Sequence, residues 1–148
     1  MAEFTYNPIQ VVEPNQNVIL NTTIGCNRGY VLHRNESGIV ILRGIVNCPT
    51  NCFARYQVTF NGNIAVPATE TIGPVAIALA IDGEPLQTSK AIVTPADVDE
   101  YFNVTSTAFI DVPRGCCFTV AVENVSTGTT TDPSINVQNA NLVVMRTA

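Results

Sequence analysis

Charge is scarce in this sequence. Asp, Glu, Lys and Arg together make up 13% of its 148 residues, whereas about 25% is usual for a soluble domain. Thr, Asn, Ser and Ala stand where those charges are normally found. Either an uncharged polar surface is sufficient for this protein, or neighbouring subunits cover much of its surface. We favour the second interpretation, because the cores of protein–protein interfaces are depleted of charged residues.

Basic clusters and long apolar runs are also missing. The seven Lys and Arg residues are scattered and the net charge is −5, so neither nucleic acid nor an anionic membrane is expected as a partner. No stretch approaches the roughly 20 apolar residues of a membrane span. The first residues carry neither the basic nor the apolar region of a signal peptide. We therefore expect that the protein does not leave a cell by the ordinary secretory route.

Residue patterns for catalysis are scarce as well. His33 is the only histidine and lies in a strand-like run, and the chain has no Gly-x-Ser-x-Gly elbow and no Gly-rich phosphate loop. The acidic group Asp97, Asp99 and Glu100 has oxygens of the kind that bind calcium, but a solvated loop is the preferred interpretation. We expect no enzyme activity, no cofactor and no bound metal.

The chain has five cysteines, an odd number that leaves at least one thiol without an intrachain partner. They are Cys26, Cys48, Cys52, Cys116 and Cys117. The C-x3-C spacing of Cys48 and Cys52 suits zinc, but adjacent cysteines on a strand point to opposite faces and complete such a site poorly. Two interpretations stay open. Either the thiols are buried as small hydrophobes, or they form disulfides in an oxidising exterior, with Cys26 bonding to Cys52 or Cys117.

From residue 17 onward the sequence is a series of strand-like runs separated by turns. About eight to ten strands, with a turn roughly every 10 residues, predict an all-β antiparallel sandwich of the jelly-roll type. Asp82-Gly83 is the clearest hairpin turn. Asn61-Gly62-Asn63 is also expected to be a tight turn, because Asn and Gly tolerate positive φ. Segment 94–100 has the pattern of one helical turn, but a loop is favoured.

Two strands have a face suited to packing against another copy of the chain. In Val75–Ile81 large apolar residues alternate with alanines, and in Cys116–Val125 a second set of small or polar residues alternates with the expected core. Small side chains on one face of a strand suit the close approach of another surface. The predicted contact residues are Ala76, Ala78, Ala80, Cys117, Thr119 and Ala121.

Residues 1–16 show little periodicity and end in the turn-forming run Glu13-Pro14-Asn15-Gln16. We expect an extended N-terminal arm over residues 1–16 and a jelly-roll domain over residues 17–148. Such an arm is ordered only when it docks on something. The apolar residues that would anchor it are Phe4, Tyr6, Ile9 and Val11.

Residues 73–85 have the sequence GPVAIALAIDGEP, an alternating strand that continues into an Asp-Gly turn. This stretch resembles the central hairpin of the tumour necrosis factor-like jelly-roll family. The family includes complement globular heads and the C-terminal heads of collagen-like spore-surface glycoproteins. The later segments AFIDV, FTVAVEN and NLVVMR, at 108–112, 118–124 and 141–146, resemble the later strands of that family. The chain is also similar to small proteins of gut Firmicutes and their prophages.

The resemblance implies a homotrimer with protomers packed around a threefold axis. The chain departs from the collagen-like glycoproteins because it has only the short arm and no Gly-x-y stalk before the domain. We therefore interpret it as a non-catalytic structural protein of a virion surface, a phage head decoration protein or short head fibre whose arm binds the major capsid protein or another surface lattice. The alternatives are a spore-coat or exosporium surface protein and a carbohydrate-binding adhesin head that recognises host glycans.

Overall fold

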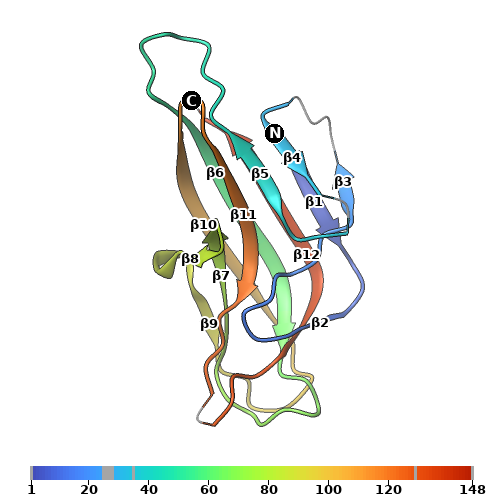
Figure 1. Cartoon of the computed structure of the whole chain (residues 1–148). Helices are drawn as coiled ribbons and strands as arrows, with labels where there is room; N and C mark the ends of the chain where they lie inside the picture. Colours follow the sequence, from blue (N-terminus) through green and yellow to red (C-terminus); the bar gives the residue numbers. More distant parts are fainter. Residues whose placement is uncertain (1, 25–28, 35, 129, 148) are drawn as a thin grey trace.

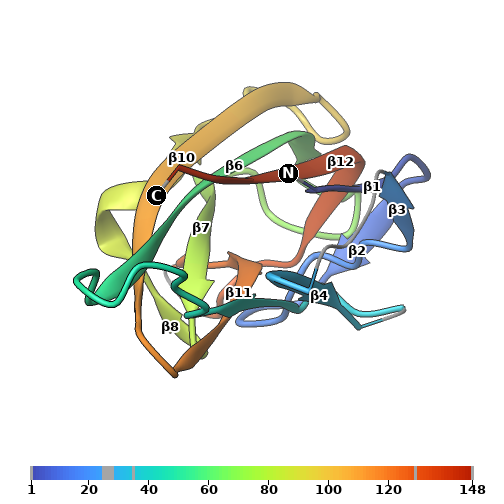
Figure 2. The same cartoon turned by 90° about the horizontal axis from the view of Figure 1, so that it is seen from above.

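The computed structural model describes residues 2–24, 29–34, 36–128 and 130–147. These residues form twelve β-strands and one short 3-10 helix, arranged as two antiparallel sheets that face each other (Figures 1 and 2). The predicted all-β antiparallel jelly-roll sandwich is confirmed. Among the described residues no helix is long and apolar enough to cross a membrane.

The first sheet has the strand order β10-β6-β12-β1-β3. The short strand β2 also pairs with β12, at residues 135–137, which precede the stretch that pairs with β1. Its strands are β1 (Ala2–Tyr6), β2 (Gln10–Val12), β3 (Thr22–Ile24), β6 (Phe53–Ala65), β10 (Phe102–Pro113) and β12 (Ile135–Arg146). The long pair β6 and β10 stays in register from Phe53 opposite Pro113 to Ile64 opposite Phe102. This pair gives the sheet a long, continuous surface.

The second sheet has the order β4-β5-β11-β7-β8, and β9 pairs with β7. Its strands are β4 (Val31–His33), β5 (Val40–Arg43), β7 (Val75–Ile81), β8 (Glu84–Pro85), β9 (Ala91–Val93) and β11 (Cys117–Asn124); the 3-10 helix η1 (Gln87–Ser89) lies between β8 and β9. The β7–β8 hairpin turns at Asp82 and Gly83, which have φ of 51° and 85°. This is the predicted hairpin, and the predicted loop over 94–100 is likewise present.

The core lies between the sheets and follows the alternation of the sequence. In β6 the expected inward set Tyr56, Val58 and Phe60 is fully buried, because successive side chains of a strand point to opposite faces. In β11, Val120 and Val122 are buried as expected, whereas Phe118 is only partly buried.

The turn predicted at Asn61-Gly62-Asn63 is wrong, because β6 runs straight through these residues. A Cβ on Gly62 would lie 2.9 Å from Cζ of the Phe60 ring. The glycine is therefore needed for the packing of Phe60 and not for a turn. The two asparagines point outward, where Asn61 accepts a hydrogen bond from Thr105 and Asn63 accepts one from Asn103.

The predicted division into an arm and a domain at residue 16 is not present in the structure. Residues 2–6 form β1, which lies between β12 and β3 in the first sheet. Phe4 is completely buried in the core, whereas Ile9 and Val11 are exposed. The chain takes this course because alternate apolar side chains at Ala2 and Phe4 fill one face of a strand. Both ends of the described chain consequently lie at the same end of the sandwich (Figure 1).

We predict that Phe4→Ala lowers the free energy of unfolding by about 3–5 kcal/mol, because it leaves a cavity where a buried ring was packed. Urea denaturation monitored by circular dichroism measures this change. The matched control is Ile9→Ala, an exposed apolar residue in the same N-terminal segment, for which a change within about 0.5 kcal/mol is expected. Equal effects of the two substitutions would show that residues 2–6 are not part of the core.

Candidate assembly surface

The first sheet presents a long surface to solvent, made by the outward residues of its three longest strands. We call it the outer face. It consists of Phe53, Arg55, Gln57, Thr59, Asn61 and Asn63 of β6, Asn103, Thr105, Thr107, Phe109, Asp111 and Pro113 of β10, and Gln138, Asn141, Val143 and Met145 of β12. Arg55 and Asp111 are the only charged residues of this set.

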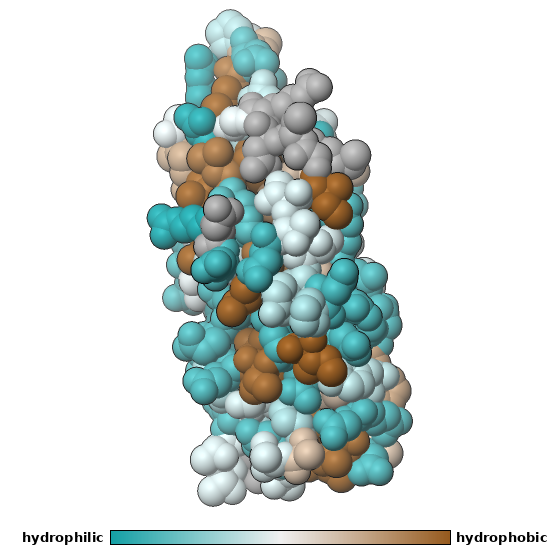
Figure 3. All heavy atoms as spheres, turned by 90° about the vertical axis from the view of Figure 1, so that its right-hand side faces the viewer, coloured by the Kyte–Doolittle hydropathy of each residue, from teal (hydrophilic) through white to brown (hydrophobic). Residues whose placement is uncertain are grey.

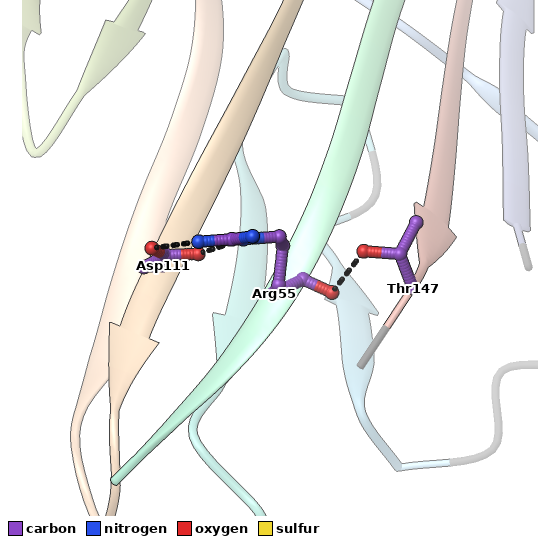
Figure 4. Close-up of polar contacts among 3 residues, drawn as sticks. All are labelled: Arg55, Asp111 and Thr147. Atoms are coloured by element: carbon purple, nitrogen blue, oxygen red, sulfur yellow. Dashed lines mark hydrogen bonds and ion pairs between the residues drawn. The ribbon is translucent and has the colours of Figure 1, made fainter.

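These two charges neutralise each other at one end of the outer face. Arg55 Nε and Nη2 donate to the two carboxylate oxygens of Asp111 at 2.7 and 2.9 Å (Figure 4). The hydrogen bond from Arg55 holds the pKa of Asp111 below its ordinary value, and the same bond raises the pKa of Arg55. Both side chains are therefore ionised at neutral pH, and their charges cancel. The next charge on this side of the sheet is the carboxylate of Glu3 in β1, which accepts a hydrogen bond from Asn141.

The backbone around Arg55 is fixed by the end of the chain. The amide N–H and the hydroxyl of Thr147 both donate to the carbonyl oxygen of Arg55, at 2.9 and 3.3 Å, and Figure 4 shows the hydroxyl contact next to the ion pair. The Arg55 guanidinium also lies 5.2 Å from the centre of the Phe53 ring. The charged end of the outer face is thus ordered by β6, β10 and the residue that follows β12.

Two exposed apolar side chains lie next to the ion pair, on either side of Gln57. Phe109 is opposite Gln57, and Gln57 is opposite Met145, so the three side chains form one row across the strands. The Phe109 side chain is 63% exposed and that of Met145 is 39% exposed. A phenyl ring that is mostly in water on a strand gains free energy when another surface covers it.

Rows of uncharged polar residues fill the rest of the outer face. Thr107 donates a 3.2 Å hydrogen bond to Thr59. The two rows beyond it are the Thr105–Asn61 and Asn103–Asn63 hydrogen bonds. Side chains that are already paired within the sheet lose less when water is excluded from them than unpaired polar groups would. The outer face can therefore be covered by a partner at a low desolvation penalty.

The predicted contact residues lie in the other sheet, and four of the six are unavailable to a partner. Ala76, Ala78, Ala80 and Ala121 are buried within a single protomer. Longer residues stand directly opposite the β7 alanines, namely Ile92 opposite Ala76, Glu123 opposite Ala78 and Pro85 opposite Ala80. An alanine methyl group does not rise above such neighbours, so the pattern of small residues reflects shielding within the sheet and not a contact between copies.

The other two predicted contact residues are accessible but differ in role. Cys117 is exposed, and Thr119 is partly exposed. Thr119 donates from its amide and its hydroxyl to the Asp82 carboxylate at 2.8 and 3.1 Å. Thr119 therefore holds the β7–β8 turn in place within the protomer.

The four cysteines that the structure describes are not core residues. Cys48, Cys52, Cys116 and Cys117 are all exposed free thiols, so the interpretation of buried thiols is wrong for these four. Cys26, the proposed partner of Cys52 or Cys117, lies outside the described residues. No group of three or more His, Cys, Asp and Glu side chains among the described residues is placed to hold a metal ion.

His33 has a structural environment. Its ring lies 4.8 Å from the Phe4 ring, and its Nδ1 and Nε2 contact the Thr23 hydroxyl at 3.3 Å and the Ser37 carbonyl at 3.0 Å. Both ring nitrogens are thus engaged by groups that join β3, β4 and the turn before β5. In this position the imidazole ties β1 and β3 of the first sheet to β4 of the second.

Comparison with known proteins now places the fold. The globular domain of zebrafish complement 1qA matches with a TM-score of 0.56 and 12% identity, over 96% of this chain and 94% of that one. This chain has the complement-head jelly-roll fold. The sugar-binding C-terminal domain of EclA matches with a TM-score of 0.44 and 15% identity, over 95% of this chain and 79% of that one. No family model matches the chain, and no curated protein matches its sequence.

Two cavities lie elsewhere on the jelly roll. One, of about 560 Å³, lies between the loop 70–74 and the loop that follows β11, and Thr71, Thr127 and Thr131 are among its lining residues. The other, of about 430 Å³, is lined by Val11, Ile19 and their neighbours. Seen from the side of β1, β3 and β4, apolar groups are separated by polar ones (Figure 3).

Glu123, which shields Ala78 on the second sheet, gives a pH-dependent contribution to stability. Burial raises the pKa of Glu123, and Glu84 raises it further. A carboxyl with a raised pKa in the folded state favours folding only when it is protonated. Its contribution is fully present below the ordinary pKa of glutamate, about 4.3, and is lost as the pH rises through the folded-state value.

We predict that Glu123→Gln raises the melting temperature relative to the parent at pH 7 by a few degrees and changes it little near pH 4. Thermal unfolding of both proteins across this pH range measures the difference between their melting temperatures. Taking the difference cancels the effect of Asp111, whose lowered pKa gives the opposite pH trend in both proteins. Glu84→Gln should act in the same direction but more weakly, since the charge of Glu84 is the smaller cause of the shift. A pH-independent difference between parent and Glu123→Gln would contradict the assignment.

Proposed function

We propose that the protein is a non-catalytic structural head that assembles with copies of itself into a homotrimer on the surface of a particle. The observation that carries this proposal is the outer face, whose two charges cancel in one ion pair and which exposes Phe109 and Met145 on either side of Gln57. Interface centres are depleted of charged residues and enriched in aromatic residues and Met. The outer face has this composition, and it accounts for part of the charge deficit of the whole chain.

Threefold symmetry is the finer part of the proposal and is supported by two considerations. The resemblance to the tumour necrosis factor-like family implies protomers packed around a threefold axis. A ring of three also requires a heterologous contact, in which one patch of a protomer meets a different patch of its neighbour. The outer face supplies one such patch on three long strands, and it replaces the alanine face of β7 as the site where copies meet.

Attachment to a larger particle would use the edge near β2. Phe4 is buried and cannot contact a particle. Ile9 and Val11 are 54% and 65% exposed, and they are the residues that would bind it. Val11 also lines the cavity of about 430 Å³ with Ile19. We propose the surface lattice of a virion as the partner, with this protein as a decoration protein or short fibre of a phage head.

A spore-coat or exosporium protein is the alternative, and one observation favours it specifically. Exposed cysteines are unusual in folded proteins, where Cys is among the most buried residue types. Four are exposed here. A coat layer held together by covalent bonds would use them, whereas a decoration protein held by the outer face would not need them.

We predict that Phe109→Asp converts the assembled protein to a monomer at micromolar concentration, because it replaces an exposed apolar ring of the contact with an additional negative charge. Size-exclusion chromatography with light scattering under reducing conditions measures the mass. The matched control is Ile92→Asp, since Ile92 is a similarly exposed apolar residue, 59% against 63%, on a strand of the second sheet, and this variant should keep the assembled mass. A parent protein that is already monomeric at this concentration would overturn the proposal.

Labelling of particles distinguishes the two settings. We predict that gold-labelled antibodies against the chain bind purified phage particles in a regular array over the head and do not bind spores. Ile9→Asp combined with Val11→Asp should remove the protein from the heads while leaving the mass of the free assembly unchanged. Labelling of spores alone would replace the phage proposal with the coat protein.

A further inference from the structure

The four exposed thiols lie at one end of the sandwich. Cys48 and Cys52 belong to the loop between β5 and β6, and Cys116 and Cys117 stand at the start of β11. In Figure 1 that loop rises at the end where β11 begins. We call residues 44–52 and 113–117 together the thiol end.

Backbone hydrogen bonds join the two halves of the thiol end. The Arg114 N–H donates to the Cys52 carbonyl at 2.9 Å, and the Gly44 N–H donates to the Cys116 carbonyl at 2.8 Å. The Arg114 guanidinium also donates to the Pro49 carbonyl at 3.2 Å. The two backbone segments that carry the four cysteines are therefore joined to each other at this end of the sandwich.

The surroundings of the thiols suit a second copy of the same chain. Arg114 is the only charged residue of the thiol end, and its guanidinium already bonds to Pro49. Arg43 stands opposite Cys117 next to this end, and its guanidinium likewise donates to a carbonyl oxygen, that of Gly29. In a contact between two copies through this end, these cations are therefore already hydrogen-bonded within each copy. A twofold contact brings the same patch of both copies together, so thiols from each copy face thiols from the other.

One of the four thiols has a contact that favours its reactive form. The Cys48 sulfur lies 3.0 Å from the Thr50 hydroxyl, and this hydrogen bond lowers the pKa of Cys48 below its ordinary value. The thiolate is the nucleophile in disulfide exchange. Cys48 is also exposed, so a small disulfide can reach it.

We propose that the thiol end is a covalent linkage site, at which two copies of this chain are joined by a disulfide made by exchange with a small disulfide such as oxidised glutathione. The Cys48 thiolate attacks one sulfur of the small disulfide, forms a mixed disulfide and releases one small thiolate. A thiolate of the second copy then attacks the Cys48 sulfur, forms the disulfide between the copies and releases the second small thiolate. The small disulfide is reduced to two thiols, and two protein thiols are oxidised.

The experiment incubates the purified full-length protein with oxidised glutathione and follows covalent dimer on non-reducing gels and by intact mass. The parent should form a dimer that dithiothreitol dissolves. Cys48→Ser should lose most of this dimer, and the fourfold Ser variant at 48, 52, 116 and 117 should lose all of it. Cys26→Ser is the matched control and should form the dimer as the parent does.

Each other outcome overturns the proposal. A dimer that persists in the fourfold variant and disappears in Cys26→Ser would place the linkage outside the thiol end. Glutathione adducts or intrachain disulfides without dimer would show that the thiols react but do not join copies. Because Cys48, Cys52, Cys116 and Cys117 are exposed, folding of the variants at these positions should be unchanged within about 0.5 kcal/mol, which circular dichroism checks for every variant. The linkage is independent of the trimer, whose mass is read under reducing conditions.

Discussion

The pairing of the first strand with the last one is the constraint on which the rest of the structure depends. β1 lies against β12 from Ala2 opposite Val144 to Tyr6 opposite Ala140, so the two ends of the chain meet in the middle of the first sheet. Without β1, residues 140–144 of β12 would lose their partner strand on that side. The core would also lose the side chain of Phe4. The closure joins residues at the greatest possible sequence separation, and contacts of that kind form late and slowly. The sandwich is therefore complete only when the whole chain is available.

The pairing of β1 with β12 also determines the surroundings of the outer face. Because β1 and β3 continue the sheet on one side of β12, the strands β12, β6 and β10 are left with one face on the core and one in water. On that free face Arg55 and Asp111 form one ion pair, and Asn141 donates to the carboxylate of Glu3 in the neighbouring strand β1. The thiols lie at one end of the sandwich, and the thiol end and the outer face adjoin at Pro113.

Much of the fold could be predicted from local patterns, and the failures have physical causes. Alternation in β6 and β11 and the Asp82-Gly83 hairpin depend on residues close in sequence. The strand through Gly62 could not be recognised, because the need for glycine comes from the ring of Phe60 and not from the backbone conformation. The outer face was missed for a similar reason. Its uncharged character emerges only when the register sets Arg55 against Asp111, residues far apart in the sequence.

The alanines of β7 show the opposite error. Small residues on one face of a strand are compatible with a contact between copies and with shielding by longer neighbours in the same sheet. Only the pairing of Ala78 with Glu123 decides between these readings. The interpretation of buried thiols was wrong for the four described cysteines because burial is the usual state of cysteine. The local sequence does not reveal that the loop before β6 and the start of β11 lie at the same end of the sandwich.

The position of the two chain ends has a practical consequence for engineering. Anything joined to residue 2 or to residue 147 leaves the molecule from the same end of the sandwich (Figure 1). A short peptide between them would suit a circularly permuted chain, since nearby ends make such rearrangements tolerable. New ends opened in the loop between β11 and β12 would then emerge at the opposite pole, and a displayed cargo could be moved from one pole to the other without altering either sheet.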